Sequence, residues 1–291
     1  MNYLQALEIA INYIEDNMEK NITVFDIART TGYSYYHFSR VFQAIIGESI
    51  GSYLKSRRLS EAADDLLNSN TNILEIALKY GFTTHEAFTR TFKKRYHKSP
   101  SSYRKHGVSY FIEKKKVIDF SMLEYLEKNH KIQKPKIMRV ETFTTIGKNY
   151  QTSLLNNEIV NAWKDFISYI KKNITSIPIR SYALCNTDTP YYDEKGDVLF
   201  SHQLSIDYSS TYKNIPDTME KRIVLGGRYA VFLHQGKVRD LVKTYEYIWG
   251  IWLLNNEEEF DESRVDFEVY DERFLGTEHL ESIVEIFIPL K

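Results

Sequence analysis

The sequence predicts a helical first region followed by an α+β second domain, and three observations lead to that prediction. Apolar residues over 1–107 recur only at helical spacing. A pair of short helices in that region recurs at an offset of 49 to 50 residues. From residue 136 onwards, the order strand, helix, strand, strand occurs twice. We therefore predict an all-α N-terminal domain with two helix-turn-helix units and an α+β C-terminal domain built from two βαββ repeats.

Length and composition indicate two globular domains. At 291 residues the chain is long enough for about two domains, each with its own apolar core. The single cysteine, Cys185, excludes an intramolecular disulfide and has no neighbours at metal-ligand spacing, which predicts a cytoplasmic protein without a metal site. The most apolar stretch, 245–254, contains Glu246 and is shorter than the ~18 residues of a membrane span, so we expect no membrane segment.

Short helices in the first region begin at capping residues and end at glycines. Thr23 with Asp26 resembles a capping box, and it opens a helix that stops at Gly32. Ser34 then caps the next helix. The same arrangement recurs 49 residues later around Gly81. These signals predict two helix pairs of the same design.

The repeat includes the second helix of each pair. Residues 38–42, Phe-Ser-Arg-Val-Phe, correspond to residues 88–92, Phe-Thr-Arg-Thr-Phe, with one extra residue in the second copy. The phenylalanines are predicted core, whereas the arginines are predicted to be exposed. An amphipathic helix over about 51–67 joins the copies. Two copies of a helix, a glycine-containing turn and a second helix indicate helix-turn-helix units more specifically than one copy.

Charge is distributed unevenly along the chain. The first 107 residues carry 14 basic and 11 acidic residues, whereas the remainder carries 24 and 28. Seven of the basic residues gather near the end of the first region: Arg90, Lys93, Lys94, Arg95, Lys98, Arg104 and Lys105. Such a cluster is either a solvated surface or part of a nucleic-acid footprint.

The second domain begins after a predicted connector over 108–135. Its predicted first half consists of strands at 137–147, 180–187 and 198–207 with a helix at 156–172. Its predicted second half consists of strands at 222–234, 264–270 and 282–288 with a helix at 237–254. We expect both halves to form one antiparallel sheet backed by two helices, so the domains are 1–107 and 136–291.

The first domain resembles the DNA-binding domain of AraC/XylS-family transcription regulators. The resemblance is carried by Asp26-Ile27-Ala28, Gly32-Tyr33-Ser34, Phe38, Arg40, Phe42, Tyr53 to Arg58, Ile76-Ala77, Gly81-Phe82, Phe88, Arg90, Phe92-Lys93, Pro100 and Tyr103-Arg104. The second domain looks like a GyrI-like effector-binding domain through Gly147, Tyr229, Gly236, Trp252, Phe267-Glu268-Val269-Tyr270-Asp271 and Ile286 to Pro289. The order of the two domains is like that of Rob-type regulators.

The first resemblance implies which side chains face DNA bases. In the first recognition helix these are Tyr36, Ser39 and Arg40, and in the second they are His85, Glu86, Ala87 and Arg90. An arginine reads guanine through two parallel hydrogen bonds, whereas Glu86 either accepts from a cytosine amine or caps its helix after Thr83. Arg90 either reads a base, binds phosphate or forms an ion pair. Arg57 and Arg58 either contact phosphate or lie on an ordinary helix surface.

The second resemblance implies a site for an amphipathic, often cationic, effector. The candidate effector-binding residues are Glu268, Tyr270, Trp249, Trp252 and Tyr182. Aromatic rings attract organic cations through their π faces, and a partly desolvated carboxylate supplies the opposite charge. The alternatives are that the tryptophans pack helix against sheet as core residues and that Glu268 is an ordinary strand carboxylate.

We therefore predict a sequence-specific transcription regulator, specifically an activator, whose partners are double-stranded DNA, a small-molecule effector and RNA polymerase. The prediction includes no enzyme activity, no cofactor, no metal and no membrane partner. One alternative is constitutive DNA binding with a second domain that docks proteins. The other is a small-molecule hydrolase in which Glu268 acts with Tyr270 or Tyr229 as base and hydrogen-bond donor.

Overall fold

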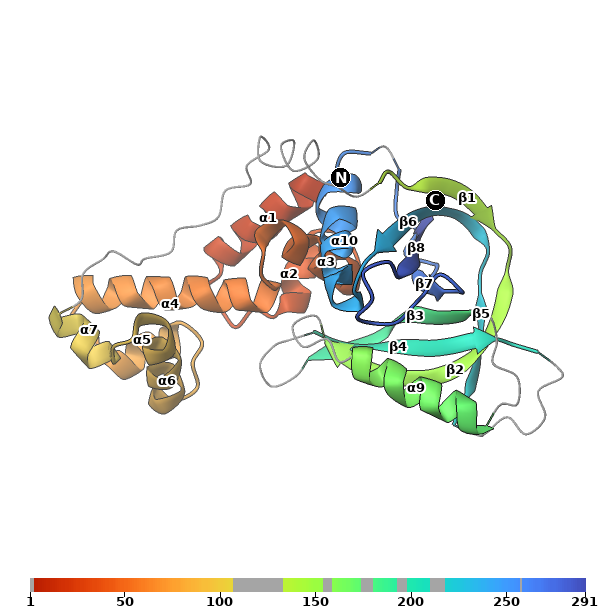
Figure 1. Ribbon diagram of the computed structural model, residues 1–291. Helices are drawn as coiled ribbons and strands as arrows, with labels where there is room; N and C mark the ends of the chain where they lie inside the picture. The colour runs from red at the N-terminus through yellow and green to blue at the C-terminus, as the bar shows by residue number, and fades with distance from the viewer. Residues whose placement is uncertain are drawn as a thin grey trace. The chain divides into compact units, whose positions relative to one another are not determined.

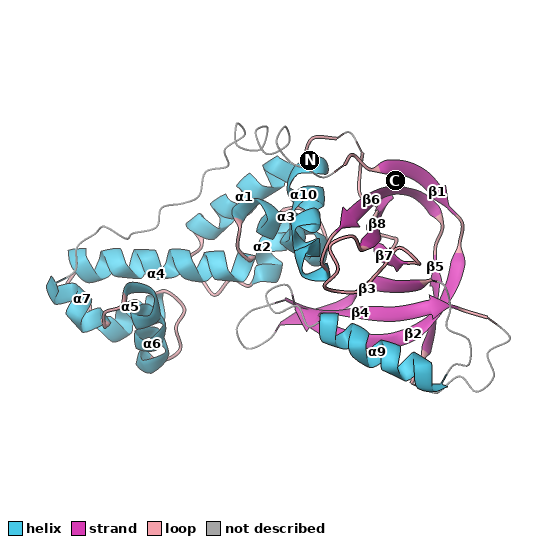
Figure 2. Cartoon of the chain, in the orientation of Figure 1, coloured by secondary structure: helices cyan, strands magenta, loops and turns pink. Residues whose placement is uncertain are grey.

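The chain divides into two compact units, Met1–Phe120 and Ser121–Lys291. This computed structural model describes residues 3–106, 133–153, 159–173, 180–192, 198–209, 218–256 and 258–291 (Figure 1). The first unit is helical and the second contains an antiparallel sheet, which confirms the predicted helical region and sheet domain (Figure 2). The connector predicted over 108–135 lies outside the described residues except for its last three. Within the described ranges, no helix is long and apolar enough to cross a membrane.

Seven helices are described in the first unit. They are α1 (Tyr3–Asp16), α2 (Val24–Thr30), α3 (Tyr35–Ile46), α4 (Ile50–Asn68), α5 (Ile73–Lys79), α6 (His85–Tyr96) and α7 (Pro100–His106). Helices α2 and α3 form the first predicted pair, and α5 and α6 form the second. Figure 1 shows the long helix α4 leading from the first pair to the second.

Side-chain caps fix where the paired helices begin. Thr23 and Asp26 form the predicted capping box of α2, and Ser34 accepts a hydrogen bond from the His37 amide at the start of α3. Helix α6 is capped by Thr84, which accepts from the Ala87 amide, and not by Thr83 as predicted. Its first turn therefore starts one residue later than expected. Glu86 is consequently the second residue of the helix, one position before the one used by a capping box.

Each helix pair encloses its own aromatic core. Phe38 and Phe42 of α3 and Phe88 and Phe92 of α6 are fully buried, as predicted. The predicted buried face of α4 packs on the second pair through Leu59, Ala62, Ala63 and Leu66. The left-handed glycines Gly32 and Gly81 end the two turns, with φ angles of 71° and 77° that side chains rarely adopt.

The three arginines of α4 and α7 hold the first unit together. Arg57 is buried and binds Glu15 of α1 through Nη2 and Oε2 at 2.8 Å. Arg58 donates from Nε to the Met18 carbonyl at 2.8 Å, so carbonyls just beyond α1 are satisfied. Arg104 donates in the same way from Nε to the Leu66 carbonyl at 3.2 Å. Arg57 and Arg58 are therefore structural residues, and the structure does not support a phosphate contact by either.

An eight-stranded antiparallel sheet forms the centre of the second unit. The strands are β1 (Lys136–Val140), β2 (Phe143–Ser153), β3 (Ser181–Tyr192), β4 (Val198–Asp207), β5 (Glu220–Val224), β6 (Gly227–Gln235), β7 (Phe267–Tyr270) and β8 (Ile283–Leu290). Their order in the sheet is β1-β6-β8-β7-β3-β4-β2-β5. Helix α9 (Ile159–Asn173) follows β2, and a second helical segment follows β6.

Sharp bends lead the chain between the two ends of the sheet. Residues 141–142 connect β1 with β2, and residues 225–226 connect β5 with β6. A Cβ atom on Gly226 would lie only 2.5 Å from the Val140 carbonyl oxygen, so glycine is required there. The Gly226 amide also donates to Thr142 Oγ1 at 2.9 Å. The two bends therefore contact each other and curl the sheet.

The structure corrects three predicted elements. The strands predicted at 137–147 and 222–234 are each divided in two by these bends. The helix predicted at 237–254 consists of a 3₁₀ turn, η2 (Val238–Asp240), an α-helix, α10 (Leu241–Tyr247), and a π-helix, η3 (Ile248–Trp252).

We expect Glu15→Gln to destabilise the helical unit by about 3 kcal/mol, because it leaves the buried Arg57 without its principal counter-charge. The hydrogen bonds from Arg57 to Glu15 raise the pKa of Arg57 above its ordinary value. A guanidinium keeps its proton even without them, so Arg57 stays charged in the variant. Thermal unfolding followed by far-ultraviolet circular dichroism measures the change. The control is Glu19→Gln, because Glu19 pairs with Lys79 at the surface. Equal effects of the two substitutions would contradict this account.

Candidate functional site

The two candidate recognition helices differ in the exposure of their side chains. In α3, Tyr36, Ser39 and Arg40 are buried, with exposed fractions of 5%, 3% and 8%. The Arg40 guanidinium lies over the Tyr36 ring, 5.1 Å from its centroid, and donates from Nη1 to the Tyr36 hydroxyl at 3.2 Å. Base contact requires exposed side chains.

Helix α6 presents its candidate residues to solvent. His85, Glu86 and Arg90 are exposed, and Ala87 is half-buried. The short side chain of Ala87 leaves room beside the first turn, where the backbone amides of the helix also point outwards. The four positions thus form an accessible strip at the start of α6.

Most of the predicted basic cluster is exposed, either in the last turn of α6 or in the residues that follow it. Lys93, Lys94, Arg95, Lys98 and Lys105 are exposed. Arg104 differs, because its guanidinium donates to the Leu66 and Thr71 carbonyls. The exposed members therefore face solvent, whereas Arg104 stabilises the end of α4.

In the second unit, Glu268 lies at the centre of the sheet beneath the helices. It is 4% exposed and belongs to β7. Its two carboxylate oxygens accept hydrogen bonds from two tyrosines: Tyr245 of α10 donates to Oε1 at 2.8 Å, and Tyr270 donates to Oε2 at 2.6 Å. Burial raises the pKa of Tyr270 well above its ordinary value, and the neighbouring carboxylate adds to the shift. Both tyrosines therefore act as hydrogen-bond donors to this carboxylate.

Trp163 of α9 completes the aromatic surroundings of this carboxylate. Its ring lies 4.5 Å from that of Tyr270 between centroids. Neither Trp163 nor Tyr245 was among the predicted effector-binding residues, although both lie on the apolar helix faces that the sequence reveals. The contacts of Tyr245 with Glu268 and of Trp163 with Tyr270 depend on how the helices pack on the sheet, which periodicity does not specify. We define the Glu268 cluster as Glu268, Tyr270, Tyr245 and Trp163.

Trp249 and Trp252 belong to η3, and both pack as core residues. The Trp249 ring contacts Phe260 edge-on at 5.1 Å, and the Trp252 ring contacts Phe232 edge-on at 5.0 Å. Both tryptophans are less than a tenth exposed. Helix-on-sheet packing accounts for both, as the alternative interpretation of the sequence proposed.

Tyr182 lies on the opposite face of the sheet from Glu268. In the antiparallel pairing of β3 with β7, Tyr182 is opposite Val269, whereas Ala183 is opposite Glu268. Opposite residues project to the same face, so Tyr182 and Glu268 do not meet. The Tyr182 hydroxyl instead donates to Asp207 Oδ1 at 2.8 Å. Burial raises the pKa of Tyr182, and this hydrogen bond adds to the shift.

Tyr229 is also separated from Glu268. It packs in a cluster with Phe267 and Phe287, on the face opposite the helices. Its hydroxyl donates to the Leu225 carbonyl at 3.0 Å. A pairing of Glu268 with Tyr229 as base and donor therefore has no geometric support. Among the described residues, no group of three histidines, cysteines or carboxylates is placed to hold a metal ion.

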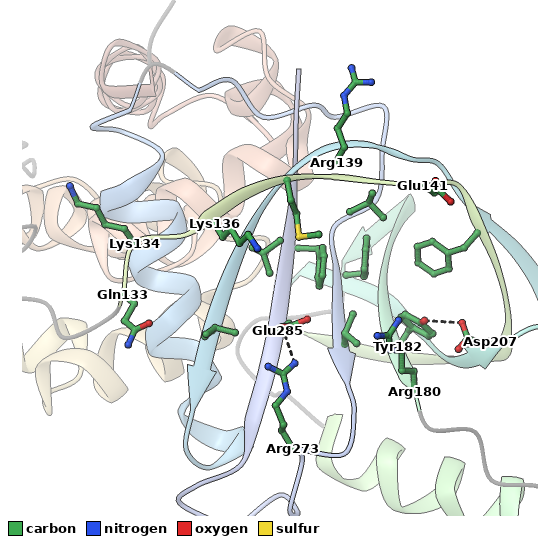
Figure 3. Close-up of a pocket in the computed structure, with 18 residues that line it drawn as sticks. Gln133, Lys134, Lys136, Arg139, Glu141, Arg180, Tyr182, Asp207, Arg273 and Glu285 are labelled. Carbon is green, nitrogen blue, oxygen red and sulfur yellow. Dashed lines mark hydrogen bonds and ion pairs between the residues drawn. The ribbon is translucent and has the colours of Figure 1, made fainter.

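A cavity of about 740 Å³ opens on the face that carries Tyr182 (Figure 3). Val231, Phe267 and Phe287 contribute apolar side chains to its lining. The labelled residues in Figure 3 show that charged side chains surround these apolar groups, including an ion pair between Arg273 and Glu285. The second unit thus offers two distinct polar environments, one on each face of the sheet.

Comparisons with known proteins agree with the two units. Residues 133–291 match the sequence profile of the GyrI-like small molecule binding domain, and residues 27–106 match that of a helix-turn-helix domain. The right origin-binding protein of Escherichia coli strain K12 is 28% identical over 236 residues, covering 77% of this chain and 76% of that protein.

Two further relatives match the first unit. The HTH-type transcriptional regulator YbfP of Bacillus subtilis strain 168 is 45% identical over 104 residues, covering 36% of this chain. The chain spans only 35% of that relative's length. The HTH-type transcriptional activator AarP of Providencia stuartii is 39% identical over 98 residues, covering 34% of this chain and 73% of that protein. The chain therefore belongs to the GyrI-like family and joins this small-molecule binding domain to an N-terminal AraC-type helix-turn-helix domain.

Proposed function

We propose that this protein is a transcription activator that binds DNA through both helix pairs and responds to an amphipathic cation in its second domain. DNA binding is supported by the accessible strip on α6, which lies beside surface lysines. The strip consists of His85, Glu86, Ala87 and Arg90. The role of activator is supported by the relative AarP, and an activator contacts RNA polymerase. We assign residues 1–107 to DNA binding, 136–291 to ligand binding, and 108–135 to the connection.

In the proposed function, the pairs α2–α3 and α5–α6 are two helix-turn-helix units. Helix α4 has 19 residues and therefore spans roughly 28 Å. Adjacent major-groove faces are about 34 Å apart, so α4 together with the width of a helix pair is a suitable spacer. Arg90 of the second unit reads a base, and Arg40 of the first does so once its side chain is exposed. One chain then occupies two half-sites without dimerising.

The proposed ligand site is the Glu268 cluster. A carboxylate at its centre favours a positive charge, and the rings of Trp163, Tyr245 and Tyr270 offer π faces to an organic cation. Tyr245 and Trp163 come from two different helices, so a ligand that separates them from β7 also moves those helices. A difference in ligand affinity between the two helix arrangements is what allows the ligand to alter activity. The proposed activity is therefore sensing rather than catalysis.

We expect Arg90→Ala to weaken binding to an optimal DNA sequence by about 1–3 kcal/mol and to relax the preference for one base, because a bidentate contact is lost. Arg40→Ala has the same effect if both units read bases. Selection of sequences from a random DNA pool, followed by measurement of Kd, provides the test. The control is Lys94→Ala, which weakens binding to all sequences alike if Lys94 contacts phosphate. An unchanged base preference in both arginine variants would refute base reading.

The ligand site is tested by titrating benzyltrimethylammonium while recording tryptophan fluorescence. All three tryptophans lie in the second domain, so their emission reports on it. We expect saturable quenching by this cation but not by neutral benzyl alcohol. Glu268→Gln is expected to weaken the affinity for the cation about tenfold, because the side chain keeps its shape but loses its charge. Glu285→Gln removes a carboxylate from the opposite face of the sheet and is expected to leave the affinity for the cation unchanged. Equal quenching in wild type and Glu268→Gln would exclude Glu268 as the contact.

A further inference from the structure

The cavity on the open face of the sheet exposes apolar side chains to solvent. Met138 of β1 and Leu233 of β6 line it and are 39% and 41% exposed. Phe267 and Phe287 stack in parallel below them, with ring centroids 4.6 Å apart. An apolar floor with exposed edges inside a cavity of this size is typical of a small-molecule site.

The strand register determines which charges point into this cavity. Lys136 is opposite Val231 in the pairing of β1 with β6, so it projects to the cavity face. Arg139 is opposite Arg228 and projects to the other face, and Figure 3 shows its side chain directed away from the cavity. Arg180 precedes β3 by one residue and shares the face of Tyr182, beside which Figure 3 shows it.

The cations and anions of the cavity do not cancel. Apart from Arg139, whose side chain points away, its lining contains four basic and three acidic side chains. Arg273 is neutralised by Glu285, with Nη2 and Oε1 2.8 Å apart, and Asp207 accepts the Tyr182 hydroxyl. Within the described ranges, neither Lys136 nor Arg180 takes part in an ion pair. Lys134, Lys136 and Arg180 therefore remain as cations of the lining, and the strand register directs Lys136 and Arg180 to the cavity face.

We propose that this cavity is a second ligand site, which binds an organic anion with a flat apolar body. The body lies over the apolar floor and covers Met138 and Leu233, and the acid group pairs with Lys136 or Arg180. Arginine suits a carboxylate through its two parallel donors, whereas lysine acts as a point charge. The site differs from the Glu268 cluster both in its face of the sheet and in the sign of its charge. It does not depend on the cation site being correct.

Isothermal titration calorimetry with 2-naphthoate, using the full chain, tests the proposal. We expect saturable binding of 2-naphthoate and weaker binding of the neutral analogue 2-naphthamide. Lys136→Gln and Arg180→Gln each remove one exposed charge. The variant that loses the contact with the acid group is expected to bind 2-naphthoate up to about fivefold more weakly. The double variant Lys136→Gln/Arg180→Gln is expected to weaken the affinity for 2-naphthoate at least as much. Arg139→Gln, from the same strand as Lys136 but the other face, serves as the matched control and is expected to retain full affinity.

Three results would overturn the second site: no saturable heat with 2-naphthoate, equal affinity for 2-naphthamide, or undiminished affinity in the double variant. Glu268→Gln separates this site from the proposed cation site. Retained 2-naphthoate binding in Glu268→Gln supports two sites, even if the cation response proves absent in wild type. Loss of 2-naphthoate binding in a folded Glu268→Gln variant would show that one site takes both ligands and would refute this inference.

Discussion

The alternation of side chains along β7 is the constraint on which the second domain depends. This strand lies between β8 and β3 in the middle of the sheet, and all four of its residues are buried. Because successive residues of a strand project to opposite faces, Glu268 and Tyr270 lie beneath the helices while Phe267 and Val269 form the floor of the open face. A shift of one residue in register would exchange these sets. The two faces therefore acquire their different chemistry from four consecutive residues.

A comparable separation of roles applies to the arginines of the first unit. Arg57, Arg58 and Arg104 are used by the fold, where they satisfy a buried carboxylate and the carbonyls at helix ends. Arg90 remains exposed on α6. A charge leaves water favourably only when hydrogen bonds or counter-charges replace it. Arg57 has a carboxylate partner, and Arg58 and Arg104 donate to backbone carbonyls. An exposed arginine such as Arg90 therefore loses fewer existing contacts when it binds DNA.

Local signals in the sequence predicted much of this fold. The capping residues Thr23 and Ser34 fixed helix starts because a cap acts on amides only two or three residues away. The bends at 141–142 and 225–226 were not predicted, since their cause is the close approach of two segments that are distant in the chain. The π-helix at Ile248–Trp252 was not predicted, because the spacing of its apolar residues does not distinguish it from an α-helix. Likewise, the placement of Tyr182 required the pairing of β3 with β7, which no local pattern encodes.

The proposed function requires that a ligand in the second domain changes the affinity of the first domain for DNA. The most direct test measures the Kd of the full chain for its selected DNA sequence, with and without saturating benzyltrimethylammonium. We predict a change of at least about fivefold in wild type, the lower end of typical allosteric coupling, and no change in Glu268→Gln. A DNA affinity that stays constant while the cation is demonstrably bound would contradict the claim.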